Sequence, residues 1–510
     1  MGYKTKNRDR GSDINYWDFN ETVADRKSLL FTHGIEIEYF LLDNDYGFVG
    51  NSERFKELVN SFYKIFKKES KTYDLINGRI RKLKLLDQKD LQSRPNGCKD
   101  DHKKVSAVSV RYDRGITVDI ISKDTHMATG IITVEIVTPP CKSIAELRSW
   151  LYLLQKCLRE ACQKNKLKVL PLASYPENND FCGEHHHLGV IRDWRLKSYN
   201  VIRILIPILM SLSFSSLDFK QTVPRQGDSF SSTRFPNQIL RSHRLQYTSQ
   251  IKPVPPLRNL SLNDFAKACG MTRESCRMVD INPLTPHNTL EIRVFDTQFS
   301  IIRTLNMVFL LQAAADYACS LSDDELNVIT SIFTDKCYNY FRDFIIRQGF
   351  NFYMIPSKLR RSMKGGLHNI CTACVKEERC LKRKKIANLS CEFQGKTKSL
   401  HELVSLIFFP GLLYNGSESI RKFRLKHLIG LVLDILDKEL KRLNYFGSVY
   451  HVFLSKMLDL EKTGSLYLIY EYSKNETPKG VYNFVERIQN TIIEDSGVYG
   501  DLYDPVFEEL

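Results

Sequence analysis

The stretch that decides the fold reads G-I-E-I-E-Y-F and runs from Gly34 to Phe40. Charged and apolar side chains alternate along it, and alternate side chains of a β-strand point to opposite faces of the sheet. We therefore expect a strand at about residues 31–42, with Glu36 and Glu38 together on one face and apolar side chains on the other. Neighbouring carboxylates repel each other unless a cation joins them, so this face indicates a metal site, and a pair of solvent-facing side chains is the alternative.

A second segment with the same pattern reads T-L-E-I-R-V-F-D-T, from Thr289 to Thr297. As a strand it places Glu291 and Arg293 on one face, so the two segments predict a sheet with an apolar back and a charged front that can line a cleft. A guanidinium beside a metal-binding carboxylate is suited to hold a transferring phosphoryl group. The alternative for Arg293 is an ion pair within the sheet.

Two further segments carry metal-ligand chemistry. The segment I-I-T-V-E-I-V-T-P-P contains Glu135, and G-E-H-H-H-L-G-V places His185 and His187 on one face of a strand. Carboxylate oxygens suit Mg²⁺ or Mn²⁺, although Glu135 alone is also consistent with a solvent-facing side chain. The two histidines indicate a metal or phosphate contact, and the alternatives are a surface patch or a zinc site that needs a third ligand.

An arginine-bearing loop follows in the segment S-F-S-S-T-R-F-P, which contains Arg234 and precedes Arg241 and Arg244. Such a loop can bind a substrate carboxylate or a nucleotide phosphate. The alternative is a solvated basic loop, and we weigh it more heavily for Arg241 and Arg244.

The order of the predicted elements favours an α+β fold. Strands and helices are mixed without a βαβ rhythm, which favours a largely antiparallel sheet. The chain contains no Walker loop and no G-x-G-x-x-G after a strand, which argues against a P-loop or Rossmann site. The expected strand segments are 31–42, 105–121, 130–138, 167–172, 184–191 and 289–296. The expected helices are 51–68, 144–165, 197–213, about 299–320 and an amphipathic segment from Leu425 to Leu443.

The expected organisation has three parts. A polar arm at 1–24 precedes a catalytic domain at 25–320, which contains a basic insertion at about 64–104, interpreted as an insertion or lid. The remainder, 321–510, is expected to be mainly helical and contains a basic, Cys-rich segment at 360–391.

That Cys-rich segment reads H-x2-C-x2-C-x5-C. Structural zinc is one interpretation of this spacing, and free thiols among basic residues are the other, because a second C-x2-C is missing. The candidate zinc ligands are His368, Cys371, Cys374 and Cys380.

Composition indicates a folded protein with a basic surface. The 510 residues include 74 basic and 59 acidic side chains, for a net charge of +15, and 43% are hydrophobic. This charge favours nucleic acid, an acidic protein or a polyanionic small substrate, and its wide spread is typical of a basic enzyme. The N-terminal residues show no apolar signal segment, and the apolar run Val201–Leu217 is interrupted by Arg203 and Pro207, which predicts a buried helix and no membrane span. We expect a cytoplasmic location with mostly free thiols.

Over residues 30–320, five motifs in order resemble the carboxylate–amine ligases of the second glutamate–cysteine ligase family, in the glutamine-synthetase-like superfamily. The motifs are G-x-E-x-E, V-E-I-V-T-P-P, H-x-H-x-G-V, S-x-x-x-R and T-x-E-x-R-V-x-D-T. The resemblance implies a curved antiparallel sheet that lines the active site, with helices on its outer face. It also implies that ATP phosphorylates a carboxylate, such as a glutamate γ-carboxyl, and that an amine then attacks the acyl phosphate to form an amide.

The resemblance also implies roles for individual residues. His187 lies beside the nucleotide phosphates or substrate, Arg293 stabilises the transferring γ-phosphoryl group, and Arg234 lies near the substrate or phosphates. The implied Mg²⁺ ligands are Glu36, Glu38, Glu135, His185 and Glu291. The basic insertion and the Cys-rich segment depart from the family, so cysteine is not presumed to be the amine.

Two rival functions stay open. One is another reaction on the same fold, either phosphotransfer or amide hydrolysis, and the other is a non-catalytic protein that binds nucleic acid or protein. The expected partners are a small acid and amine, with a macromolecular substrate or acidic partner at the basic segments and a homo-oligomer as further expectations.

Overall fold

The computed structural model describes residues 28–77, 107–216, 251–348, 423–459 and 478–494, with short gaps, and isolated positions outside these ranges. Several predicted features lie outside the described residues: the arm at 1–24, Arg234, Arg241, most of the basic insertion, and the Cys-rich segment with His368, Cys371, Cys374 and Cys380.

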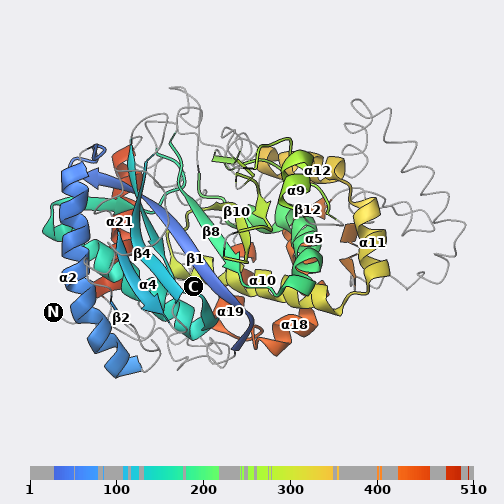
Figure 1. Ribbon diagram of the computed structural model, residues 1–510, viewed down its shortest axis with the longest axis horizontal. Helices are drawn as coiled ribbons and strands as arrows, with labels where there is room; N and C mark the ends of the chain where they lie inside the picture. Colours follow the sequence, from blue (N-terminus) through green and yellow to red (C-terminus); the bar gives the residue numbers. More distant parts are fainter. Residues whose placement is uncertain are drawn as a thin grey trace, which may run out of the picture.

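A ten-stranded sheet forms the centre of the molecule, and every strand pairing in it is antiparallel (Figure 1). Its order is β2-β3-β4-β5-β1-β8-β10-β9, and the short strands β6 and β7 also pair with β1. The strands are β1 (Ser28–Asp43), β2 (Lys84–Leu85), β3 (Val108–Tyr112), β4 (Ile116–Thr125), β5 (Ile132–Val137), β6 (Cys141–Ser143), β7 (Leu167–Leu170), β8 (Gly183–Leu188), β9 (Ile281–Asn282) and β10 (Leu290–Asp296). The predicted α+β class with an antiparallel sheet is confirmed at this level.

The central strand is β1, which carries the G-I-E-I-E-Y-F stretch. Ile35, Ile37 and Tyr39 are buried, whereas Glu36 and Glu38 stay partly exposed, as the alternation predicts. Two strands lie end to end along each edge of β1, which explains its length of 16 residues: β6 and β5 on one edge, β8 and β7 on the other.

Two helices, α4 (Ile144–Lys164) and α10 (Ile301–Ser320), cover the apolar back of the sheet. Gln155 of α4 donates to the Tyr39 hydroxyl at 3.0 Å, and Gln312 of α10 bonds the backbone of Phe31. Helix α2 (Ser52–Asn77) packs on α4, and it extends past the predicted end at 68 into the stretch interpreted as an insertion.

The start of α4 shows half of a capping box. The Ser143 hydroxyl accepts from the backbone N–H of Glu146. The Glu146 carboxylate accepts from the backbone N–H of Lys142, one residue before the cap, because β6 places that N–H within reach at 2.8 Å.

The apolar run predicted as a buried helix is α5 (Arg192–Leu209), which packs against α10. Its Arg203 is fully buried and donates to the carbonyls of Val254, Phe333 and Thr334, so the charge that interrupts the run is satisfied by backbone. No helix in the described part of the chain is long and apolar enough to cross a bilayer.

The described C-terminal part is mainly helical, as predicted. Leu436 divides the predicted segment 425–443 into α17 and α18, and α18 and α19 pack on α10. The helices are α11 (Asp323–Ile332), α12 (Asp335–Gln348), α17 (Leu425–Ile435), α18 (Asp437–Arg442), α19 (Val449–Asp459) and α21 (Pro478–Glu494), and α9 (Leu262–Ala268) precedes them.

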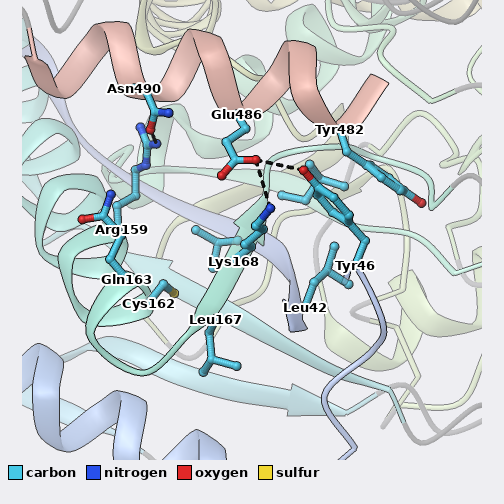
Figure 2. Close-up of a pocket in the computed structure, with 12 residues that line it drawn as sticks. Leu42, Tyr46, Arg159, Cys162, Gln163, Leu167, Lys168, Tyr482, Glu486 and Asn490 are labelled. Carbon is cyan, nitrogen blue, oxygen red and sulfur yellow. Dashed lines mark hydrogen bonds and ion pairs between the residues drawn. The ribbon is translucent and has the colours of Figure 1, made fainter. Parts of the chain in front are cut away.

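Helix α21 docks at the edge formed by β1 and β7, where a small pocket remains (Figure 2). Lys168 of β7 donates to Glu486 of α21 at 3.2 Å and lies 4.0 Å from the centre of the Tyr46 ring. The Tyr46 hydroxyl also donates to Glu486, at 2.9 Å. These contacts attach the C-terminal part to the sheet at β7.

Candidate metal and phosphate site

The sheet register brings the candidate ligands together from four neighbouring strands, β5, β1, β8 and β10. Glu36 of β1 lies opposite His185 of β8, Glu38 opposite Glu135 of β5, and Glu291 of β10 opposite His187 of β8. Adjacent strands are about 4.8 Å apart, so side chains on the same face of four strands can meet. Glu36, Glu38, Glu135, His185, His187 and Glu291 therefore lie on one face of the sheet, with Glu38 at the edge of the cluster.

Glu36 is the centre of this cluster. Its Oε2 lies 3.3 Å from His185 Nδ1, and its Oε1 lies 3.2 Å from His187 Nε2. Ligand atoms of Glu36, Glu135 and His185 all lie within 4.8 Å of one another, and the same holds for Glu36, His187 and Glu291. One carboxylate thus belongs to two groups, each of which can hold a cation.

The electrostatics of the cluster favour an ionised Glu36. Burial alone raises the pKa of a carboxyl, but the adjacent His187 and His185 outweigh it and hold the pKa of Glu36 well below its usual range. Burial likewise opposes the charge on His187, yet the Glu36 carboxylate raises the pKa of His187 above its usual value. Glu36 and His187 therefore each stabilise the charged form of the other at a largely buried position.

The residues fit a divalent cation on their own chemistry. Each group offers carboxylate oxygens and one imidazole nitrogen, donors that suit Mg²⁺ and, because of the imidazole, Mn²⁺. The buried Nε2 of His187 makes no hydrogen bond in the described structure, while its Nδ1 contacts the Thr289 hydroxyl at 3.1 Å. That second contact fixes the ring so that Nε2 faces the carboxylates, as a metal-binding histidine requires.

Glu38 lies at the edge of the cluster. Its Oε2 accepts from the backbone N–H of Gly183 at 2.7 Å, and its Oε1 lies 4.0 Å from His185 Nε2. Glu38 belongs to neither three-residue group. One of its oxygens instead binds the backbone at Gly183, the first residue of β8.

Arg293 forms the predicted alternative, an ion pair within the sheet. Its Nη1 donates to Glu291 Oε1, and the carboxylates of Glu291 and Glu38 raise its pKa against the effect of burial. The Nε of Arg293 is buried and makes no hydrogen bond in the described structure. The guanidinium thus keeps a donor for an anion beside the acidic cluster.

A β-bulge sets the position of Arg293. Ile292 lies opposite His186 and Phe295 opposite Glu184, so Arg293 and Val294 together face His185. A bulge adds one residue to a strand and re-aims its side chains, and such bulges are common beside active sites. The backbone N–H of Arg293 bonds the carbonyl of Asp280 at 2.9 Å, away from β8.

The interpretation of Arg244 as a solvated loop residue was wrong. Its side chain is only 5% exposed and lies 3.8 Å from the buried carboxylate of Asp296. Asp296 ends the T-L-E-I-R-V-F-D-T strand, and a buried carboxylate needs a partner, which is the signal that sequence reasoning missed.

A buried polar chain behind the site was also missed. On the back of β8, Glu184 accepts from the Thr304 hydroxyl at 2.8 Å and bonds His186 at 2.7 Å, and His186 bonds His33 at 2.9 Å. Burial raises the pKa of Glu184 to about 8 and lowers that of His186 to about 3. The signal was present in E-H-H-H, because residues that alternate with His185 and His187 must face the core.

Comparisons with known proteins add little. No protein-family model matches this chain, and no curated protein matches it. Among solved structures, the chain is similar to a bifunctional glutathione synthetase from Pasteurella multocida, with 10% identity and a TM-score of 0.37 over 90% of this chain and 52% of that one. The chain thus spans about half the length of that protein, and a similarity this weak carries no conclusion about fold or activity.

Proposed function

We propose that this chain is a carboxylate–amine ligase of glutamine-synthetase-like fold that uses ATP and Mg²⁺ or Mn²⁺ to form an amide. The observation that carries the proposal is the position of Glu36, which is shared by two groups of cation ligands on one face of an antiparallel sheet. The ordered motifs that resemble glutamate–cysteine ligases support the same reaction, and a glutamate γ-carboxyl is the first acid to test.

The proposed ligand sets follow the two groups. Glu36, Glu135 and His185 hold one cation, with Glu38 beside it, and Glu36, His187 and Glu291 hold a second. The cations, when bound, supply positive charge that offsets the repulsion between triphosphate and carboxylate substrate. His187 and Arg293 border the second group, so they are the residues proposed to contact phosphate.

The chemistry explains why such a face is needed. A carboxylate is a poor electrophile because its leaving group is oxide, and phosphorylation by ATP supplies a better one. The protein must bring two anions together, so it contributes mainly positioning and charge. Arg293 does this from a buried position where its guanidinium keeps an unengaged Nε, and removing one such donor costs about 10²–10³ in rate.

The remaining expectations stay predictions. They are a role for Arg234 near the substrate, structural zinc in the Cys-rich segment, the domain boundaries at 25–320 and 321–510, a cytoplasmic location and a homo-oligomer.

The test is product analysis with purified protein, ATP, Mg²⁺ and panels of acids and amines. We expect ADP, phosphate and amide in equal amounts, and only when acid, amine and metal are all present. A phosphorylated product without free phosphate identifies a phosphotransferase instead, and amine release without ATP identifies an amidohydrolase. Salt-sensitive nucleic-acid binding without nucleotide turnover identifies a binding protein.

A further inference from the structure

The bulged part of β10 is bonded by a guanidinium from a distant part of the chain. Arg244 Nη1 donates to the carbonyl of Phe295 at 3.1 Å, and Nη2 donates to the carbonyl of Arg293 at 3.0 Å. A bulge disrupts the strand ladder locally, so its backbone groups need other partners. Arg244 supplies two such donors, one to the carbonyl of Arg293 within the bulge and one to the carbonyl of Phe295 just after it.

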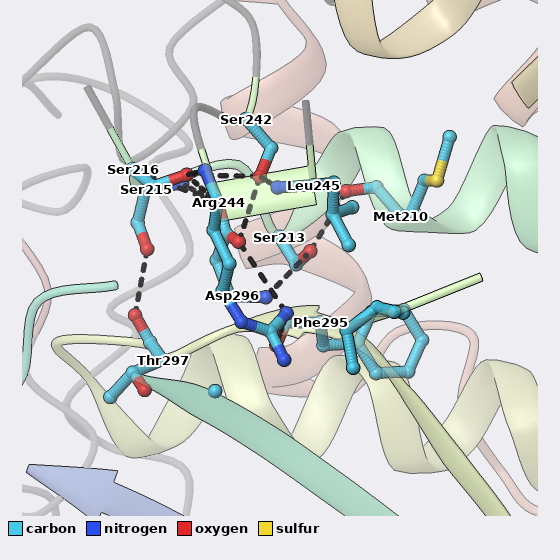
Figure 3. A network of polar contacts seen from close by, with 12 residues as sticks. Met210, Ser213, Ser215, Ser216, Ser242, Arg244, Leu245, Phe295, Asp296 and Thr297 are labelled. Atoms are coloured by element: carbon cyan, nitrogen blue, oxygen red, sulfur yellow. Dashed lines mark hydrogen bonds and ion pairs between the residues drawn. The ribbon is translucent and has the colours of Figure 1, made fainter. Parts of the chain in front are cut away.

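Arg244 is itself held by a buried network centred on Asp296 (Figure 3). Asp296 Oδ2 accepts from the backbone N–H groups of Ser215 and Ser216 and from the Ser216 hydroxyl, and Oδ1 accepts from Ser242. The Ser216 hydroxyl in turn accepts from the backbone N–H of Arg244 at 3.0 Å. The backbone of Arg244 is therefore held, through Ser216, by the carboxylate of Asp296, the last residue of β10.

The guanidinium also lies against the first residue of β8. A Cβ atom on Gly183 would overlap Arg244 Nη2, so any side chain there displaces Arg244. The N–H of Gly183 donates to Glu38. Arg244 thus lies where β10, β8 and the acidic face meet, although it is too buried to contact a substrate.

We propose that Arg244 is a positioning residue: it holds β10 in its bulged register and thereby aims the Arg293 guanidinium at Glu291 and the Glu36 cluster. The effect on turnover rests on the proposed function, because only there does Arg293 contact the transferring group. The effect of Arg244 on the register of β10 does not depend on the proposed function.

The experiment compares Arg244→Lys with Arg303→Lys, a matched control. Arg303 is also buried, but it lies in α10, pairs with Asp504 and donates to the Met457 sulfur. Lysine keeps the charge and loses the planar fork that bonds two carbonyls at once. Hydrogen exchange of peptides covering 290–296 is measured without ligands, and turnover is measured separately.

We expect Arg244→Lys to speed exchange at 290–296 by about 10-fold, with no such change in Arg303→Lys. We expect kcat to fall by about 10²-fold, with KM for the acid nearly unchanged. The double variant with Arg293→Lys is expected to lose no more than Arg293→Lys alone, because both changes act on one guanidinium. If Arg244→Lys does not fold, Ser242→Ala, which removes one bond to Asp296, should shift exchange in the same direction by a smaller amount.

The inference is overturned if exchange at 290–296 changes no more in the Arg244 variant, or in the serine variant used in its place, than in the control. It is also overturned if the losses of Arg244→Lys and Arg293→Lys multiply. Altered exchange in a protein without ligase turnover supports the positioning of β10 and rejects the proposed function. Unaltered exchange in an active ligase supports the proposed function and rejects the positioning of β10 by Arg244.

Discussion

The two faces of β8 carry the same kinds of side chain and differ in how those side chains are satisfied. On the back, Glu184 and His186 are fully buried and bonded to each other, to Thr304 and to His33. On the front, His187 Nε2 lies 3.2 Å from Glu36 without hydrogen-bond geometry, and Arg293 of the neighbouring strand β10 has a buried Nε without a hydrogen bond in the described structure. A fully paired buried polar group is explained by the fold itself, whereas a buried nitrogen without a hydrogen bond needs another explanation, and on this face the proposed cations and phosphate supply it.

The strongest way to test this difference is Glu36→Gln on the front face. Glu36 belongs to both ligand groups, so its loss should weaken Mn²⁺ binding at both and reduce turnover by about 10³-fold or more. Titration calorimetry with Mn²⁺ and the amide assay measure the two effects.

The matched control is Glu69→Gln, since Glu69 is also partly buried and pairs with a cation, Lys156, away from the site. It should leave Mn²⁺ binding and turnover unchanged. Normal Mn²⁺ affinity in Glu36→Gln would show that the cluster is not a metal site.

The next effect in size is expected for Arg293→Lys. Lysine keeps the charge but lacks the planar fork, so turnover should fall by about 10²-fold while Mn²⁺ binding stays near that of the unaltered protein. Steady-state kinetics and calorimetry separate the two. Turnover within about three-fold of the starting protein would leave Arg293 as an ion-pair partner of Glu291 only.

A change on the back face should act on stability instead. His186→Leu leaves Glu184 and His33 without their shared partner, and each unsatisfied buried group costs about 1–3 kcal/mol. Urea unfolding measures the loss, and His287→Leu at an exposed position should cost less than about 0.5 kcal/mol. A stable His186 variant that loses Mn²⁺ binding would reverse the assignment of the two faces.

The smallest effect is expected for Thr304→Val, which keeps the shape and removes the hydroxyl that donates to Glu184. One lost hydrogen bond should lower the free energy of unfolding by about 1 kcal/mol and leave turnover unchanged. A loss as large as that of His186→Leu would mean that the buried chain behaves as one cooperative unit.

The front face was predictable because its information is local. The alternation in G-I-E-I-E-Y-F and E-H-H-H fixes which residues share a face, whatever the rest of the chain does. The same alternation places Glu184 and His186 on the back face. Polar side chains that face a core need hydrogen-bond partners, and this requirement predicts a buried chain there that was overlooked.

The bulge in β10 and the place of Arg244 could not be read from the sequence. Both depend on the register between β8 and β10, which are separated by about a hundred residues, and on a contact between Arg244 and carbonyls 49 and 51 positions away. Such features are set by tertiary packing, which the local pattern does not encode. The shared face of these residues was expected, but the two candidate cation groups contain His187 in place of Glu38, and the contacts that orient Arg293 were not foreseen.

The Arg303–Asp504 pair has a consequence for how the protein is made. The two residues are 201 positions apart, and Asp504 is fully buried against the first turn of α10, the helix behind the acidic face. At about 5–20 residues per second, a ribosome adds Asp504 roughly ten to forty seconds after Arg303. Until then the bonds from Ser300 and Arg303 to the Asp504 carboxylate cannot form. The first turn of α10, behind the acidic face, therefore reaches its observed contacts only after residue 504 has been added to the chain.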